Sequence, residues 1–386
     1  MTETITRSRK LLPKGTWRTY TTAEGLAGLQ TEHLAEDAEG FLWIGTWDSG
    51  VSRFGGDEFC TFTTKDGLPH NRVQAILLDR QGRLWFGTQG GVCWWDGKEF
   101  RRFGPGNGVS DKPISFIFED QEGKLWFAGR EALGYWDGSF HDLVPEYYRQ
   151  HGQAPSSGLG IECRGIAQDR EEALWFGFIS SNLVRYDGER FYRYGEEHGL
   201  VAGAYAVAQG AEGTLWVGTD TSLYRYDGHT FQAVPLEGEV YVRKIQRDRE
   251  GQTWICTTGA GVFCYDGAEF HYFTSQDGLA YDWVNAVFQD REGQIWFATY
   301  GGGLSCCDPH SIQVLGEQEG LPKSTVSALA EDHRGRIWMG FATFSTPAAL
   351  AAYYDGEHLE TLGEQEGMDS CLILYVDSRD RLWCGG

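Results

Sequence analysis

The strongest constraint on this chain is a tryptophan that recurs at nearly constant spacing over its 386 residues. Successive copies are 38 to 49 residues apart, and five of the eight intervals are 41 or 42 residues. The nine copies are Trp43, Trp85, Trp126, Trp175, Trp216, Trp254, Trp296, Trp338 and Trp383. An Asp stands six residues earlier in eight of the nine, at Asp37, Asp79, Asp120, Asp169, Asp248, Asp290, Asp332 and Asp377. Agreement at fixed offsets over nine copies indicates an internal repeat of about 40 residues.

Residues 72–103 show what one copy contains. The first eight residues, RVQAILLD, form an apolar run of strand length and lead into an Asp-Arg-Gln-Gly turn. Residues 84–88 and 92–95 have the composition of a second and a third strand, and Asp96-Gly97 favours a tight hairpin into a fourth strand at 99–103. We therefore expect four antiparallel strands per copy. No segment has the 3.6-residue period and the caps of a long helix, so we expect little helix.

Four antiparallel strands in about 40 residues are typical of one blade of a β-propeller. The sequence therefore predicts an all-β fold, a β-propeller of four-stranded antiparallel blades with about 40 residues per blade. The repeated Trp then has a packing role, because an indole buries roughly 150–250 Å² and can join a blade to its neighbour. Residues 17–386 are interpreted as eight full repeats plus a partial ninth, preceded by an N-terminal extension, residues 1–16, that we expect to be flexible.

The number of blades has two interpretations. Residues 17–22 (WRTYTT) look like a lone outer strand before the first copy, and only two strands follow the eighth copy. In the seventh copy, the Asp-Gly of the hairpin is replaced by Asp308-Pro309, and Pro cannot form that turn in the usual way. The alternative is therefore a seven-bladed propeller over residues 17–312 and the start of a second propeller over residues 313–386.

Composition narrows the functional classes. With 33 basic and 55 acidic residues the formal net charge is −22, which argues against a nucleic acid partner. No window approaches 18 consecutive apolar residues, so no membrane segment is predicted in this chain. The first residues lack the apolar stretch of an export signal, and the nine cysteines are scattered without a CxxC pair. We therefore expect a cytoplasmic protein with free thiols, no metal site and no cofactor.

Several stretches resemble a known repeat. They are LWIGTWDSGVSRF at 42–54, LWFGTQGGVCWWDG at 84–97, LWVGTDTSLYRYDG at 215–228 and IWFATYGGGLSCCD at 295–308, with connectors such as TSQDGLAY. These strings are similar to the two-component regulator propeller repeat, and the resemblance covers roughly residues 17–386. It implies a sensor propeller, usually joined to a histidine kinase or another signalling output. The chain itself shows no kinase, cyclase or DNA-binding motif.

The two ends of the predicted blades differ in their loops. The turns between strands one and two, and between three and four, are nearly constant, whereas the other connections vary and include insertions at 141–160 and 341–350. Function concentrates on variable loops of a rigid scaffold. The predicted binding residues therefore lie on the variable face: Trp47, Asp48, Arg130, Tyr281, Trp283 and Tyr300. Such aromatic and charged groups suit a carbohydrate-like small molecule, and they equally suit a protein partner.

No catalytic residue is predicted. The ten histidines show no HxH or HExxH pairing and do not recur in register, whereas catalysis of the lyase or hydrolase type needs a positioned base and an electrophilic partner. The expected function is a non-catalytic sensor, or a propeller that binds a ligand or a signalling protein. A propeller enzyme of the lyase type and a structural interaction scaffold are the alternatives.

Overall fold

The computed structural model describes thirteen stretches of the chain. They are residues 17–103, 111–152, 161–179, 182–201, 203–210, 213–234, 236, 240–308, 325–342, 351–354, 359–362, 373–377 and 381–385. The extension that we expect to be flexible, residues 1–16, lies outside the described residues. The chain divides into two compact units, a larger one containing Trp17–Pro309 and a smaller one containing His310–Gly386.

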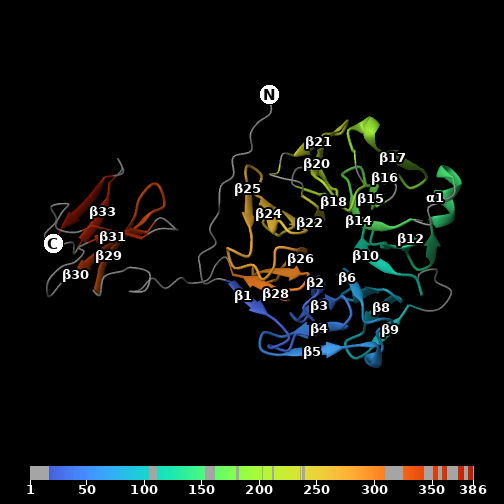
Figure 1. Ribbon diagram of the computed structural model, residues 1–386, viewed down its shortest axis with the longest axis horizontal. Coiled ribbons are helices and arrows are strands. Elements are labelled where there is room, and N and C mark those ends of the chain that lie inside the picture. The colour runs from blue at the N-terminus through green and yellow to red at the C-terminus, as the bar shows by residue number, and fades with distance from the viewer. Residues whose placement is uncertain are drawn as a thin grey trace. The chain divides into compact units, whose positions relative to one another are not determined.

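The larger unit contains seven four-stranded antiparallel sheets, and six of them are built from four consecutive strands. We number these six as blades 1 to 6 (Figure 1). Blade 1 consists of β2 (Thr31–Glu36), β3 (Leu42–Thr46), β4 (Val51–Phe54) and β5 (Phe59–Phe62). Blade 2 consists of β6 (Val73–Leu78), β7 (Leu84–Thr88), β8 (Gly91–Trp95) and β9 (Phe100–Arg102). Blade 3 consists of β10 (Ile114–Glu119), β11 (Leu125–Gly129), β12 (Ala132–Trp136) and β13 (Phe140–Asp142). Blade 4 consists of β14 (Cys163–Gln168), β15 (Leu174–Phe178), β16 (Asn182–Tyr186) and β17 (Phe191–Tyr194). Blade 5 consists of β18 (Ala206–Gln209), β19 (Leu215–Gly218), β20 (Leu223–Tyr226) and β21 (Phe231–Val234). Blade 6 consists of β22 (Val242–Arg247), β23 (Thr253–Thr257), β24 (Val262–Tyr265) and β25 (Phe270–Phe273).

Blade 7 takes its outer strand from the beginning of the chain. Its order is β1-β28-β27-β26, where β26 is Val284–Gln289, β27 is Ile295–Thr299, β28 is Leu304–Cys307 and β1 is Trp17–Tyr20. In the antiparallel β1–β28 pair, Trp17 lies opposite Cys307 and Tyr20 opposite Leu304. The first strands of neighbouring blades contact one another in turn, and β26 contacts β2. The blades of this unit therefore form a closed ring (Figure 1), and we call β1 the closure strand. The predicted all-β propeller fold is confirmed.

The smaller unit is described separately. It contains one four-stranded sheet, β29 (Thr325–Glu331), β30 (Ile337–Ala342), β31 (Ala351–Tyr354) and β32 (Leu359–Leu362), and a two-stranded sheet, β33 (Ile373–Val376) and β34 (Leu382–Gly385). Trp338 is buried here, but Trp383 is 55% exposed. The packing role predicted for all nine repeated tryptophans is therefore wrong for Trp383, because its two-stranded sheet has no further strands to cover it among the described residues.

The repeated Trp and Asp work as a pair. Trp43 is fully buried, and its ring lies 5.4 Å from that of Phe86 in the next blade. Its indole N–H donates to Asp37 Oδ2 at 2.7 Å, while Asp37 Oδ1 accepts the backbone N–H groups of Glu39 and Phe41 in the turn. The same Asp–Trp bond occurs at Trp85, Trp126, Trp175, Trp254, Trp296, Trp338 and Trp383. The Asp thus closes the turn, as predicted, and also satisfies the polar atom of the blade-joining indole.

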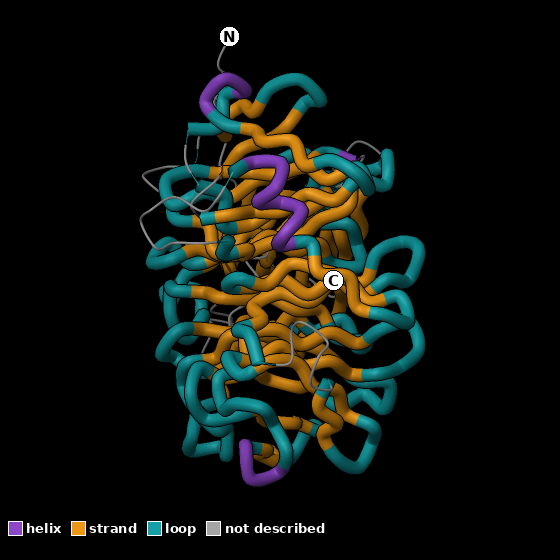
Figure 2. Tube along the Cα trace, turned by 90° about the vertical axis from the view of Figure 1, so that its right-hand side faces the viewer, coloured by secondary structure: helices purple, strands orange, loops and turns teal. Residues whose placement is uncertain are grey.

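One short α-helix interrupts the expected run of strands. It is α1, Val144–His151, within the insertion at 141–160. The described residues also include the 3₁₀ turns Thr64–Asp66 and Glu196–His198. Figure 2 shows strands, in orange, as most of the described chain, with helix, in purple, confined to short segments. The expectation of little helix is confirmed, and α1 is the element that was not foreseen.

Helix α1 lies along the outer edge of blade 4. Tyr147 is buried against the rings of Phe178 and Phe191, at 5.5 and 5.4 Å. The side chain of Gln150 accepts a bond from the Phe191 N–H at 2.9 Å and donates one to the Glu189 carbonyl at 3.0 Å. Unpaired backbone groups on an edge strand are a liability that proteins commonly cover. This insertion therefore protects the edge strand β17.

Candidate ligand-binding site

Each blade in the larger unit brings one polar residue to the ring axis, at or directly before the start of its first strand. This residue stands eleven positions before the repeated Trp, as Glu32 stands before Trp43. The seven residues are Glu32, Gln74, Ser115, Arg164, Tyr205, Arg243 and Asn285. In six of the seven blades the pairing of the first two strands shifts by one residue at this position. Such a bulge re-aims a side chain, so a constant backbone device presents a different side chain from each blade.

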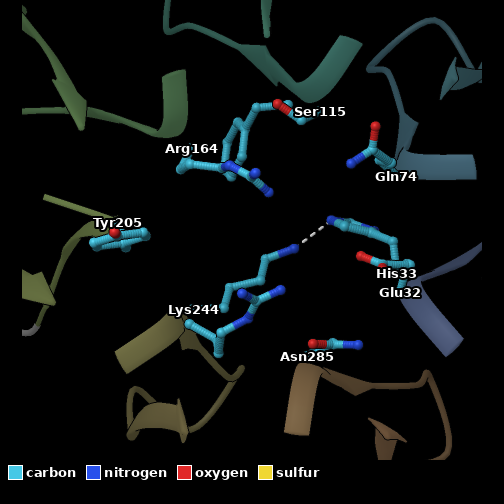
Figure 3. A pocket seen from close by; sticks show the side chains of 10 residues that line it. Glu32, His33, Gln74, Ser115, Arg164, Tyr205, Lys244 and Asn285 are labelled. Carbon is cyan, nitrogen blue, oxygen red and sulfur yellow. Dashed lines mark hydrogen bonds between the residues drawn. The ribbon is translucent and has the colours of Figure 1, made fainter. Parts of the chain in front are cut away.

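These seven residues line one pocket together with His33, Phe116 and Lys244. Figure 3 shows side chains from different strands pointing toward a common centre. The cavity volume is about 60 Å³. A single water needs roughly 10–15 Å³ on this scale, so the pocket has room for a small polar group of a few atoms. We call it the axial pocket.

The axial pocket gathers positive charge in an acidic protein. Arg164, Arg243 and Lys244 line it, with Glu32 as the acidic residue of the lining. Burial lowers the pKa of Lys244 to about 8. Its ammonium group donates to Nε2 of His33 (Figure 3). Burial and the neighbouring Lys244 charge hold the pKa of His33 well below its ordinary value, so this imidazole is neutral at pH 7. Burial raises the pKa of Glu32, and the charge of Arg243 opposes that effect.

Four buried polar atoms around this pocket have no hydrogen-bond partner within the described part of the chain. They are Oε1 of Glu32, Nδ1 of His33, Nε of Arg72 and Nε of Arg164. Other atoms of the lining are satisfied: Asn285 Nδ2, for example, donates to the Thr31 carbonyl at 2.9 Å. Because buried polar groups are normally hydrogen-bonded, this concentration makes the axial pocket the candidate site.

Three of the six predicted binding residues come together beside this pocket. The rings of Trp283 and Tyr300 stack at 4.2 Å, and Trp47 meets Tyr300 edge-on at 5.9 Å. We call these three residues the aromatic rim. The indole N–H of Trp283 donates to Asn285 Oδ1 at 3.2 Å, and the Arg243 guanidinium lies 5.7 Å from the Trp283 ring centre. The rim and the axial pocket therefore share direct contacts.

The other three predicted residues lie apart from this group. Asp48 is exposed and accepts a bond from the Ser49 hydroxyl at 2.7 Å. Arg130 is exposed in blade 3, where its backbone pairs with Glu162. Tyr281 is 47% exposed. No ring contact or hydrogen bond within the described ranges joins these three side chains to the aromatic rim, and their role in binding stays a prediction.

The lining of the axial pocket is not among the predicted site residues. A search for one chemical type that recurs in register cannot find it, because the offset is constant while the residue type changes. The usable signal is a polar residue inside an apolar run at that offset, as with Gln74 in RVQAILLD. Among the residues that the structure describes, no group of three or more His, Cys, Asp or Glu side chains is placed to hold a metal ion.

No helix in the described residues combines the length and the apolar character needed to cross a membrane.

Solved structures with a similar fold come from several kinds of protein. The extracellular domain of the hybrid two component system BT3049 from B. thetaiotaomicron is 19% identical, with a TM-score of 0.65, over 96% of this chain and 52% of that domain. The extracellular domain of the one component system BT4673 from B. thetaiotaomicron is 18% identical, with a TM-score of 0.61, over 95% of this chain and 51% of that domain. A catalytically inactive virginiamycin B lyase from Staphylococcus aureus, crystallised with quinupristin, is 14% identical, with a TM-score of 0.57, over 75% of this chain and 98% of the lyase.

The chain spans about half the length of the two extracellular domains that it matches. At these identities the likeness concerns the fold. No curated protein matches the chain.

The expected cytoplasmic location is corrected by this comparison, because the similar structures include extracellular domains of two-component systems. The expectation rested on the missing apolar stretch at the start of the sequence and on the scattered cysteines. Neither observation identifies a compartment. Buried thiols such as those of Cys93, Cys163 and Cys256 pack in the cores of their blades, as small apolar side chains do in any compartment.

The family resemblance is confirmed by three of the repeats. Residues 67–90, 278–301 and 320–342 match the family "Two component regulator propeller". The first two stretches each run from a blade connector through the first two strands of a blade, β6–β7 and β26–β27. They therefore include Gln74 and Asn285 of the axial pocket, and the second also contains Trp283 and Tyr300 of the aromatic rim. The chain contains two-component regulator propeller repeats.

Proposed function

We propose that the larger unit is a sensor module that works outside the cytoplasm and binds a small molecule without transforming it. The ligand would enter at the aromatic rim and reach into the axial pocket. The observation that carries this proposal is the variation at one position of an otherwise repeated scaffold. Seven blades use the same backbone position at the axis and present six different residue types there. A purely structural channel has no need of such variety.

The chemistry of the site supports recognition. Stacked rings at Trp283 and Tyr300 offer flat apolar surface, and aromatic faces are common platforms for sugar rings and other planar ligands. The amide of Gln74, the hydroxyl of Ser115 and the phenol of Tyr205 offer both hydrogen-bond donors and acceptors to a polar ligand. Pockets with a few convergent polar groups and an apolar border are the usual form of small-molecule sites.

A signalling role is supported by the comparisons. The repeats belong to the two-component regulator type, and the similar extracellular domains are parts of two-component and one-component systems. Ligand capture by the ring would be passed on to a signalling partner. The likeness to virginiamycin B lyase extends to the fold alone, at 14% identity.

The test is a binding screen with the full chain and a variant that carries Trp283→Ala and Tyr300→Ala. A panel of neutral and acidic mono- and oligosaccharides and small aromatic acids is examined by thermal unfolding and calorimetry. At least one compound should raise the unfolding midpoint of the wild type and lose most of its affinity in the rim variant. Tyr192→Ala, which alters a 42% exposed ring on β17, is the control and should bind as the wild type does.

Two results would contradict the proposal. One is that every compound bound by the wild type binds equally well to a folded rim variant, with folding checked by circular dichroism. The other is turnover of a bound compound, which would favour a lyase-type enzyme.

A further inference from the structure

We infer that the axial pocket holds the oxyanion group of the ligand, a carboxylate, sulfate or phosphate, between Arg164, Arg243 and Lys244. This inference rests on the proposed function and specifies its ligand as an anion. The body of the ligand would lie outside the pocket against the aromatic rim.

The first argument is the direction of the basic side chains. Arg243 and Lys244 are neighbours in β22, and consecutive residues of a regular strand point to opposite faces of the sheet. In β22 the register shifts between Val242 and Lys244. The bulge lets both basic side chains line the same pocket. Two adjacent cations that point into one small cavity repel each other, and an anion between them would offset this repulsion.

The second argument is the shortage of counter-charges. Among the described residues that line the pocket, Glu32 is the one acidic residue. Arg164 has a partner in Glu162, at 2.5 Å, but its Nε is left without one in the described residues. Neither Arg243 nor Lys244 forms an ion pair with a described residue, and the charge of Glu32 acts on both without such a contact. Buried charge without compensation is costly. In a chain with a net charge of −22, a pocket that keeps this excess of cations is best explained by an anion that fills it.

The third argument is size. A cavity of about 60 Å³ has room for an oxyanion group, since one water needs roughly 10–15 Å³ on this scale. The Arg243 guanidinium lies near the rings of both Trp283 and Tyr241, at 5.7 and 5.6 Å, so it stands where the pocket meets its aromatic border. An oxyanion bonded to Arg243 would place the adjoining ring of the ligand beside the rim.

Glu32 restricts where the oxyanion can lie. Its carboxylate repels an anion, so the oxyanion is expected on the side of Arg164, Arg243 and Lys244. The partnerless Oε1 of Glu32 is then available to accept a bond from a hydroxyl or amine of the same ligand. The lining therefore suits a ligand that carries both an oxyanion and a hydrogen-bond donor.

The test uses sulfate, inorganic phosphate and acetate as probes, with chloride at equal ionic strength as the reference. Binding to the full chain is followed by its tryptophan fluorescence and by the unfolding midpoint. We expect at least one oxyanion to bind more tightly than chloride. Its Kd should rise about tenfold or more in Lys244→Met and in Arg243→Gln, because each loses a charge-assisted hydrogen bond. Matched controls are Lys98→Met and Arg190→Gln, which should leave the Kd unchanged. Both residues are exposed and lie in the nearly constant turns between the third and fourth strands of their blades.

The outcomes separate this inference from the proposed function. The pattern among sulfate, phosphate and acetate identifies the class of oxyanion. Oxyanions that bind no better than chloride, or equally well to folded Lys244→Met, would overturn the inference. If neutral compounds of the screening panel then still require the aromatic rim, the sensor proposal stands without it. If oxyanions require Lys244 but no compound requires the rim, the pocket stands and the rim assignment fails.

Discussion

At the scale of single residues, the charge of the axial pocket depends on Lys244. Burial lowers its pKa to about 8, from an ordinary value near 10.5, so the ammonium form dominates below pH 8 and is lost above it. Nearby groups change little in that window. Burial raises the pKa of both Cys256 and Tyr205 to about 12, and His33 is already neutral. The other basic residues of the lining are Arg164 and Arg243.

The first prediction is a loss of sulfate affinity between pH 7 and pH 9. Sulfate keeps its two charges over this range, so the change reports the protein. The depressed pKa of Lys244 means that its positive charge, and the attraction that it supplies, disappears as the pH rises through about 8. Calorimetric titration at several pH values should show a falling affinity for the wild type. Lys244→Met should bind weakly and with no such slope, and an equally flat wild-type profile would contradict the assignment.

The second prediction concerns the Asp–Trp pair. Asp37→Ala removes the acceptor of the buried Trp43 N–H and of two turn amides. Leaving a buried donor unpaired costs about 1–3 kcal/mol. The free energy of unfolding, measured in urea, should therefore fall by about 1–3 kcal/mol or more. Asp48→Ala, at an exposed loop position, should stay within about 0.5 kcal/mol of the wild type. Equal midpoints for Asp37→Ala and the wild type would contradict a stabilising role for both the bond to Trp43 and the bonds within the turn.

At the scale of elements, the strands could be predicted because each is fixed by local pattern. The second strand predicted at 84–88 is β7 to the residue, and the run at 72–79 becomes β6, Val73–Leu78. Helix α1 could not be predicted, since it is only eight residues long and has no side-chain cap at its start. Its helical form depends on contacts with blade 4, which lies after it in the chain. The pocket lining was missed for a related reason: convergence of seven residues on an axis is a property of the ring.

The third prediction tests the role of α1. Tyr147→Ala removes the buried ring that packs on Phe178 and Phe191, and it removes the bond that Arg193 donates to the Tyr147 hydroxyl at 2.9 Å. A large aromatic-to-Ala change in a core costs about 3–5 kcal/mol. Hydrogen exchange at the Phe191 amide, which bonds to Gln150, should accelerate. Arg149→Ala, on the exposed side of the helix, is the control and should keep that amide protected.

At the scale of the whole molecule, repeat spacing alone could not decide the number of blades. The two interpretations of the chain share every local pattern and differ in one pairing between distant segments. That pairing joins β1 to β28, residues 17–20 to residues 304–307. Sequence offsets describe how a blade is built, whereas closure depends on which outer strand completes the last sheet.

The last prediction tests this closure. Trp17 lies on the closure strand with its ring 5.4 Å from Phe297 and 6.3 Å from Phe273. It occupies the place that Phe191 has in blade 4, opposite the last residue of the third strand. Trp17→Ala and Phe191→Ala each remove a large aromatic ring, and each should cost about 3–5 kcal/mol of stability. The two variants should differ in how easily the outer strand separates from its sheet. Strand β17 follows β16 through a short turn, whereas β1 comes from the other end of the unit to pair with β28. Hydrogen exchange should therefore show early opening of the β1–β28 pair in Trp17→Ala and an intact pair in Phe191→Ala. Equal protection of that pair in both variants would mean that the Trp17 ring does not hold the ring of blades closed.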